Sequence, residues 1–124
     1  MNTGSALSGS ATSVNFSATC GFIAGQFTIQ VPITQSGAAH YFSATGVITG
    51  SVSTNSPSNP IRVLVPDTDA SVGAYFDITY TRTTIGAGSS VAFTVARTAQ
   101  SGTASNIDLD TTRSALVFLA RGSS

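Results

Sequence analysis

The sequence predicts an all-β protein, and three observations support that fold class. Apolar and polar residues alternate with a period of two along most of the chain, as expected of strands that bury one face. Clusters of Gly, Ser, Asn and Pro separate these runs, as turns do. Helix formers are scarce, and no segment shows a capped 3.6-residue period. We therefore expect a two-sheet β-sandwich or jelly roll of about eight antiparallel strands.

The predicted domain begins after an N-terminal arm. Residues 1–12 are rich in Gly, Ser, Ala and Thr and contain only Leu7 as a sizeable apolar group. Such a segment buries too little apolar surface to offset its own ordering entropy, so we expect it to be flexible. Residues 13–121 then form a single β-sandwich domain, and residues 122–124 form a short tail.

Each expected strand is a run of alternating residues. The clearest runs are residues 14–20, 26–33, 61–65, 74–81 and 91–96. The region 40–52 predicts one or two further strands, broken near Gly46. Residues 114–120 are apolar on both faces, which is typical of a central or interface strand. Turn signals at residues 24–25, 35–37, 55–60, 86–88 and 100–102 separate the strands.

Charge is scarce and balanced. Five Arg and five Asp make up 8% of the residues and leave a net charge of zero, against a usual charged fraction of about 25%. Copies of the chain therefore repel each other only weakly, which favours assembly. The dispersed arginines offer no patch for a phosphate backbone, so we expect no nucleic-acid partner. No segment has the pattern of a secretion signal or a membrane span, so we expect synthesis in the cytoplasm and no membrane partner.

The stretch PDTDASVG, residues 66–73, holds two of the five acidic residues. Asp67, Asp69 and Ser71 match the first three ligand positions of a calcium loop. The glycine and the bidentate glutamate that such loops require are missing from their positions. We therefore expect a polar turn, with Pro66 ending the preceding strand and the carboxylates accepting backbone N–H groups. Calcium binding is the alternative, and no other metal or cofactor is expected.

Other residues that could support chemistry have a structural interpretation. Asp108 and Asp110 lie two apart, so on a strand both face solvent opposite the core residues that alternate with them. His40 is the only histidine, and no Gly-x-Ser-x-Gly motif marks a serine nucleophile. Cys20 has too few partners for a zinc site. We expect no enzymatic activity, and a minimal hydrolase using His40 remains the alternative.

Four residues are the expected contacts with other proteins. Leu7 is the apolar group of the arm, and Tyr75 lies on the outward phase of its strand. Val117 and Leu119 belong to the terminal run that is apolar on both faces. Tyr is enriched at protein interfaces. Glycan binding is the alternative for Tyr75, although the chain has no Trp to form a sugar platform.

Over its full length, in overall character, the chain resembles the small decoration or cement proteins of tailed bacteriophages. The resemblance rests on the Lys- and Glu-free, Ser/Thr/Gly/Ala-rich composition and on the arm MNTGSALSGSATS, and no diagnostic motif accompanies it. It implies a structural protein on the virion surface that binds the major capsid protein or another virion protein. It also implies a homo-oligomer, with a trimer favoured. A receptor- or glycan-binding tip domain of a phage fibre or other surface structure shares this character and is the alternative.

Overall fold

The protein is described by a computed structural model that covers residues 2–20, 25–48, 60–66, 73–82, 89–100 and 107–121. Within these residues every regular element is a strand, which confirms the all-β class. The strands are β1 (Asn2–Ala6), β2 (Ser8–Ser10), β3 (Ser13–Cys20), β4 (Gly25–Gln35), β5 (Ala38–Ile48), β6 (Ile61–Pro66), β7 (Gly73–Arg82), β8 (Ser89–Gln100), β9 (Ile107–Leu109) and β10 (Ser114–Arg121).

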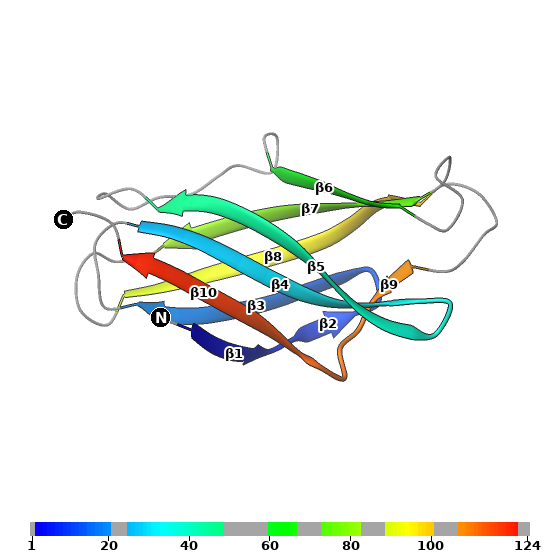
Figure 1. Ribbon diagram of the computed structural model, residues 1–124, viewed down its shortest axis with the longest axis horizontal. Coiled ribbons are helices and arrows are strands. Elements are labelled where there is room, and N and C mark those ends of the chain that lie inside the picture. The colour runs from blue at the N-terminus through cyan, green and yellow to red at the C-terminus, as the bar shows by residue number, and fades with distance from the viewer. Residues whose placement is uncertain are drawn as a thin grey trace.

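The strands form two antiparallel sheets of five (Figure 1). In the first sheet the order is β1-β10-β4-β5, and β9 also pairs with β4. In the second sheet the order is β2-β3-β8-β7-β6. Because β10 lies between β1 and β4, the prediction of a central strand for the apolar terminal run is confirmed.

The inward faces of the two sheets share one core. Phe27 of β4 meets Phe93 of β8 edge to face, with ring centroids 5.1 Å apart. Phe42 of β5 stacks on Phe76 of β7 at 4.8 Å. The alternation predicted from the sequence therefore places apolar side chains between the sheets. Further buried members of this core are Val14, Phe16, Ile29, Val31, Ile33, Ile78, Val91, Val95, Ile107, Leu109, Ala115 and Val117.

Strand β5 passes through Gly46 without interruption, so the predicted break at this glycine is wrong. Gly46 pairs with Phe27, and a Cβ at Gly46 would stand 2.4 Å from Cζ of the Phe27 ring. The glycine therefore makes room for a core ring instead of ending a strand. The turn predicted at residues 35–37 is confirmed, because Ser36 and Gly37 connect β4 to β5 with φ values of 50° and 81°, as a two-residue hairpin turn requires.

Where the sequence predicts a flexible arm, the structure has two short strands, one in each sheet. Residues 2–6 pair with β10, and residues 8–10 pair with β3. Leu7, between them, is half-buried against the core. The carbonyl of Ala11 then accepts from the N–H of Leu109, and that of Thr12 accepts from the N–H of Arg97. Backbone pairing with two sheets supplies the order that the apolar content of the segment cannot supply.

Strands β9 and β10 both pair with β4, and the gap between them lies opposite Pro32. Pro32 lies inside β4 and has no N–H, so a neighbouring strand cannot form a full ladder there. β9 ends at Leu109 and β10 begins at Ser114, one on each side of this position. The N–H of Asp110 still donates to the Pro32 carbonyl at 3.0 Å. The break places Asp110 and Arg113 in a turn beside the β4–β5 hairpin.

Candidate protein-contact surface

Four large hydrophobic side chains are exposed among the described residues. Leu64 and Tyr75 are 51% and 40% exposed, and Tyr41 and Val47 are 45% and 55% exposed. The first two lie in the second sheet, on β6 and β7, and the other two lie on β5 of the first sheet. Exposed hydrophobic groups that gather on one surface mark sites of protein interaction.

Leu64 and Tyr75 are direct cross-strand partners, so their side chains stand next to each other on the outer face of the sheet. The pair two residues along consists of Arg62 and Asp77. The Asp77 carboxylate accepts from Nε of Arg62 at 2.7 Å and from Nη2 at 2.9 Å. The Arg62 guanidinium also lies 5.5 Å from the centre of the Tyr75 ring. We call these four residues the Leu64–Tyr75 surface.

The two charges of this surface neutralise each other. The hydrogen bonds from Arg62, together with its positive charge, hold the pKa of Asp77 below its ordinary value, although partial burial opposes the shift. The same hydrogen bonds raise the pKa of Arg62. The pair is therefore ionised at neutral pH and has no net charge. An apolar Leu–Tyr pair beside a satisfied Arg–Asp pair is suited to contact with another protein, since Tyr and Arg are enriched at such contacts.

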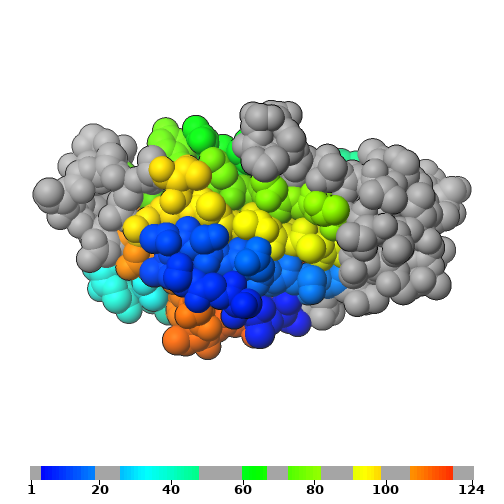
Figure 2. All heavy atoms as spheres, turned by 180° about the vertical axis from the view of Figure 1, so that it is seen from behind, coloured from blue at the N-terminus to red at the C-terminus, as the bar shows by residue number. Residues whose placement is uncertain are grey.

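A β-bulge adjoins Tyr75. The register between β7 and β8 shifts between Tyr75 and Phe76, because Tyr75 pairs with Ala99 whereas Phe76 pairs with Arg97. The extra residue, Thr98, donates from its hydroxyl to the Tyr75 carbonyl at 3.5 Å. Bulges bend a strand and re-aim its side chains. Strands β3, β8 and β7 lie side by side on the face of the molecule shown in Figure 2.

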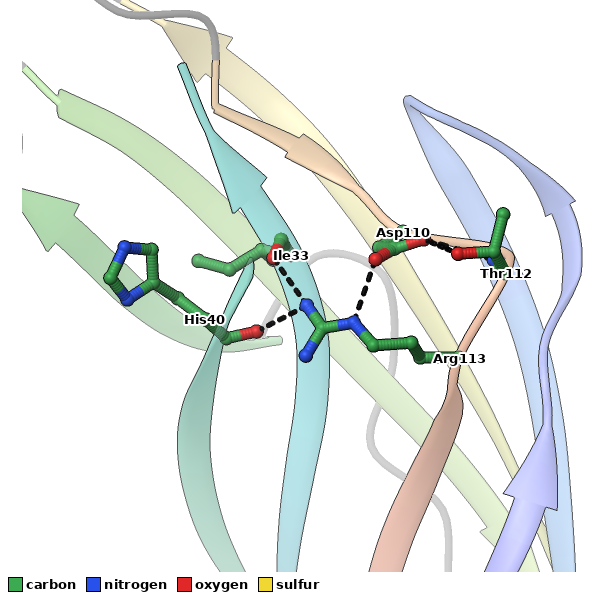
Figure 3. A network of polar contacts seen from close by, with 5 residues as sticks. All are labelled: Ile33, His40, Asp110, Thr112 and Arg113. Atoms are coloured by element: carbon green, nitrogen blue, oxygen red, sulfur yellow. Dashed lines mark hydrogen bonds and ion pairs between the residues drawn. The ribbon is translucent and has the colours of Figure 1, made fainter. Parts of the chain in front are cut away.

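A second polar cluster ties the Asp110–Arg113 turn to the β4–β5 hairpin (Figure 3). Arg113 donates from Nε to Asp110 at 2.7 Å. Its Nη2 donates to the carbonyls of Ile33 at 2.6 Å and His40 at 2.8 Å. Asp110 also accepts from the N–H of Thr112 at 3.0 Å and from its hydroxyl at 2.5 Å. The bonds to Ile33 and His40 join residues that are far apart in the sequence.

This cluster stabilises the contact between the Asp110–Arg113 turn and the β4–β5 hairpin. Hydrogen bonds from Thr112 and Arg113 lower the pKa of Asp110 to about 2, so it holds no proton at neutral pH. His40 contributes its carbonyl to the cluster, and its imidazole ring points away from Arg113 (Figure 3). The Arg113 guanidinium covers one face of the Tyr41 ring, 4.6 Å from its centre.

Asp108 and Asp110 are paired with different arginines. Ile107 and Leu109 are buried, and Asp108 and Asp110 lie on the opposite phase, as the alternation predicts. Arg97 of β8 donates to Asp108 and, at 2.8 Å, to the carbonyl of Ile107. Asp110 is paired with Arg113 instead. The two acids therefore tie different parts of the fold together and do not form one acidic site.

Of the expected partner contacts, Tyr75 is exposed as predicted. Val117 is fully buried in the core, so the prediction that it contacts a partner is wrong. Its strand is apolar on both faces because it is central, and the alternate residues Leu116 and Phe118 are the half-buried ones on the outer phase. Leu119 of β10 pairs with Phe27 of β4. The side chain of Leu119 lies outside the described residues.

The expected acidic turn also lies outside the described residues, since Asp67, Asp69 and Ser71 fall between β6 and β7. Pro66 is the last residue of β6, as predicted. The sequence pattern does not mark Leu64 or Arg113 as a contact residue. Leu64 shares the outward phase of Arg62, but its contact with Tyr75 depends on the register of two strands. No sequence signal indicates the carbonyl partners of Arg113.

Within the described residues, His, Cys, Asp and Glu do not form a group of three or more that could hold a metal ion. The same part of the chain has no helix with the length and hydrophobicity needed to cross a membrane. Comparison with protein-family models, with curated proteins and with solved structures found no match.

Proposed function

We propose that this chain is a structural virion protein, a decoration or cement protein that binds and stabilises a phage head through protein–protein contacts. In this proposal the two sheets form a β-sandwich. The Leu64–Tyr75 surface is the observation that carries it, because an exposed Leu–Tyr pair stands beside an ion pair that is already satisfied. The low charge and the Ser/Thr/Gly/Ala-rich composition support the same role.

The contact would work by removing Leu64 and Tyr75 from water against another protein. Burying apolar side chains stabilises the complex by roughly 25 cal/mol per Å² before the cost of association is subtracted. Because Arg62 and Asp77 neutralise each other, many copies can bind close together with little repulsion. In this proposal the partner is the major capsid protein or another virion protein, copies of the chain form a homo-oligomer, and the location is the virion surface. No catalysis, cofactor, nucleic acid or membrane is involved.

In this proposal the N-terminal segment is part of the folded domain and not a flexible arm. Its pairing with β10 and β3 joins the two sheets at one edge of the molecule. We assign it to the stability of the domain, and we assign attachment to the Leu64–Tyr75 surface.

The proposal is tested by adding purified chain to empty heads of the tailed phage that encodes it. We expect saturable co-sedimentation and a higher temperature of head disruption, which differential scanning calorimetry measures. Absence of binding by a folded chain would refute the proposal.

A receptor- or glycan-binding tip domain is the second candidate, and a groove favours it. An open groove of about 330 Å³ lies where the N-terminal segment passes from one sheet to the other. Thr94 donates to the Asn15 amide oxygen at 2.7 Å within the lining. Hydroxyl and amide groups of this kind bind sugar hydroxyls. Titration with a panel of saccharides, followed by the amide NMR signals of Asn15 and Thr94, tests this candidate. The groove is lined by Ser5, Ala6, Ser8, Asn15, Phe16, Ser17, Ala92, Phe93 and Thr94.

A further inference from the structure

We propose that two copies of the chain associate through β5, by antiparallel pairing of their outer edges about a two-fold axis at Ser43. The inference rests on the proposed function only for the expectation that copies associate. It uses the first sheet, whereas the Leu64–Tyr75 surface belongs to the second. The two contacts can therefore fail independently.

The direction of the backbone groups along β5 follows from two hydrogen bonds. The N–H of Asp110 donates to the Pro32 carbonyl, so even-numbered residues of β4 point toward β9 and odd-numbered ones point toward β5. Across the hairpin, even-numbered residues of β5 bond back to β4, and odd-numbered ones point away from it. The hydroxyl of Tyr80, from the other sheet, donates to the carbonyl of Val47 at 2.8 Å, which agrees with that direction. The residues whose N–H and C=O groups point outward are Ala39, Tyr41, Ser43, Thr45 and Val47.

Among the described strands, β5 differs from the other three strands that end a sheet. β1 has five residues and β2 has three, which leaves little edge to pair. β6 has six, includes Arg62 and ends at Pro66. β5 has eleven residues with no charged residue and no proline, and its register with β4 continues without a bulge. Proteins that keep a sheet edge unpaired protect it with short strands, charges, prolines or bulges. The composition of β5 is therefore that of a strand that has a partner.

The side chains of β5 support the same conclusion. Among the described side chains of the first sheet, the large exposed hydrophobics are Tyr41 and Val47, and both lie on this strand. Pairing centred on Ser43 places Tyr41 opposite Thr45 of the second copy, where aromatic and β-branched side chains contact each other. Val47 comes opposite Ala39 of the second copy. The pairing covers the exposed Tyr41 and brings no charged residue of β5 into the ladder.

A second copy fits this edge better than an unrelated partner. The strand is uncharged and the chain has no net charge, so two copies approach without electrostatic repulsion. Identical strands that pair in antiparallel orientation are related by a two-fold axis, which closes the assembly as a dimer. This geometry favours a dimer over the trimer implied by the phage resemblance. Because Tyr80 occupies the Val47 carbonyl, the ladder is centred on Tyr41–Thr45, and we expect a concentration-dependent dimer.

The test uses opposite charges at the axis. Ser43 is exposed, so Ser43→Lys and Ser43→Glu should both fold, which circular dichroism checks. Wild-type chain should sediment as a dimer at high concentration. Each variant alone should be monomeric, because like charges face each other across the axis. An equimolar mixture of the two variants should recover dimers that contain one chain of each. Ser13→Lys, at an exposed position of β3, is the matched control and should dimerise as wild type.

A backbone variant provides an independent test of pairing through β5. Ser43→Pro removes an N–H that points outward, so it should abolish dimerisation and leave the hairpin pairing with β4 intact. Wild-type chain that stays monomeric up to its solubility limit would overturn the inference. An oligomer that persists in all three Ser43 variants would also overturn it, since copies would then meet elsewhere. Neither result would affect binding through the Leu64–Tyr75 surface, which the experiment with phage heads tests separately.

Discussion

Gly46 and Phe27 face each other across β5 and β4, and no other residue type fits opposite the ring in its present position. A Cβ at Gly46 would stand 2.4 Å from Cζ and 2.5 Å from Cε2 of Phe27. Since this Cβ would overlap a buried ring, we predict that Gly46→Ala lowers the free energy of unfolding by about 1–3 kcal/mol. Urea denaturation measures the change. Gly4→Ala is the control, because its Cβ would approach no atom closer than 4.0 Å.

The same relationship predicts a non-additive pair. Phe27→Leu leaves space beside residue 46, so Gly46→Ala should cost less in that background than in the wild type. Equal costs in the two backgrounds would show that the ring does not determine the residue at position 46.

The Asp110 cluster predicts how stability depends on pH. Its pKa is about 2 in the folded protein and about 3.9 in an unfolded chain. The carboxylate therefore stabilises the fold above about pH 4, and this contribution is lost as the pH falls toward 2. Urea midpoints at pH 6, 4 and 2 should fall less steeply for Asp110→Asn than for wild type. Asp77, whose pKa is also lowered, should account for part of the remaining fall. Identical pH profiles would contradict the assignment.

The fold was largely predictable because alternation records which residues face the core. Runs such as residues 91–96 gave the inward face of β8 correctly, and the two-sided apolar run gave a central β10. Alternation does not say whether an apolar face meets the core or a partner. The sequence therefore predicts a contact surface at Val117, which is fully buried. It also predicts a break at Gly46, since a sequence does not show the ring opposite a glycine.

The candidate site was less predictable because it depends on register and on backbone acceptors. Tyr75 was found through its outward phase, but its neighbour Leu64 becomes visible only once β6 and β7 are aligned. Arg113 donates to the carbonyl of Ile33, 80 positions away in the chain. Carbonyl groups are present at every residue, so no side-chain pattern indicates such a bond.

Two neighbouring substitutions in β10 should differ in severity. Val117→Asp places a carboxylate without a partner in a fully buried position, so we expect loss of folding. Leu116→Asp alters the outer, half-buried phase of the same strand and should leave a folded domain of reduced stability. Circular dichroism and the thermal midpoint distinguish the two. A folded Val117→Asp variant would show that β10 does not face the core as described.

The N-terminal strands predict that truncation destabilises the domain. Deleting residues 2–10 removes the pairing with β10 and β3 and the contact of Leu7 with the core. Since each backbone hydrogen bond contributes roughly 0.5–1.5 kcal/mol, we expect a loss of at least about 2 kcal/mol in the free energy of unfolding. An unchanged thermal midpoint would mean that the segment acts as a detachable arm after all.

The most direct test of the central claim is a binding isotherm on empty phage heads for three chains: wild type, Tyr75→Ser and Ala92→Ser. Tyr75 belongs to the Leu64–Tyr75 surface, and Ala92 is an exposed residue of β8 in the same sheet. If the Leu64–Tyr75 surface makes the contact, Tyr75→Ser should bind at least about tenfold more weakly, as expected for an interface hot spot. Ala92→Ser should bind as wild type does. Equal binding by all three folded chains would contradict the claim that this surface attaches the protein to the head.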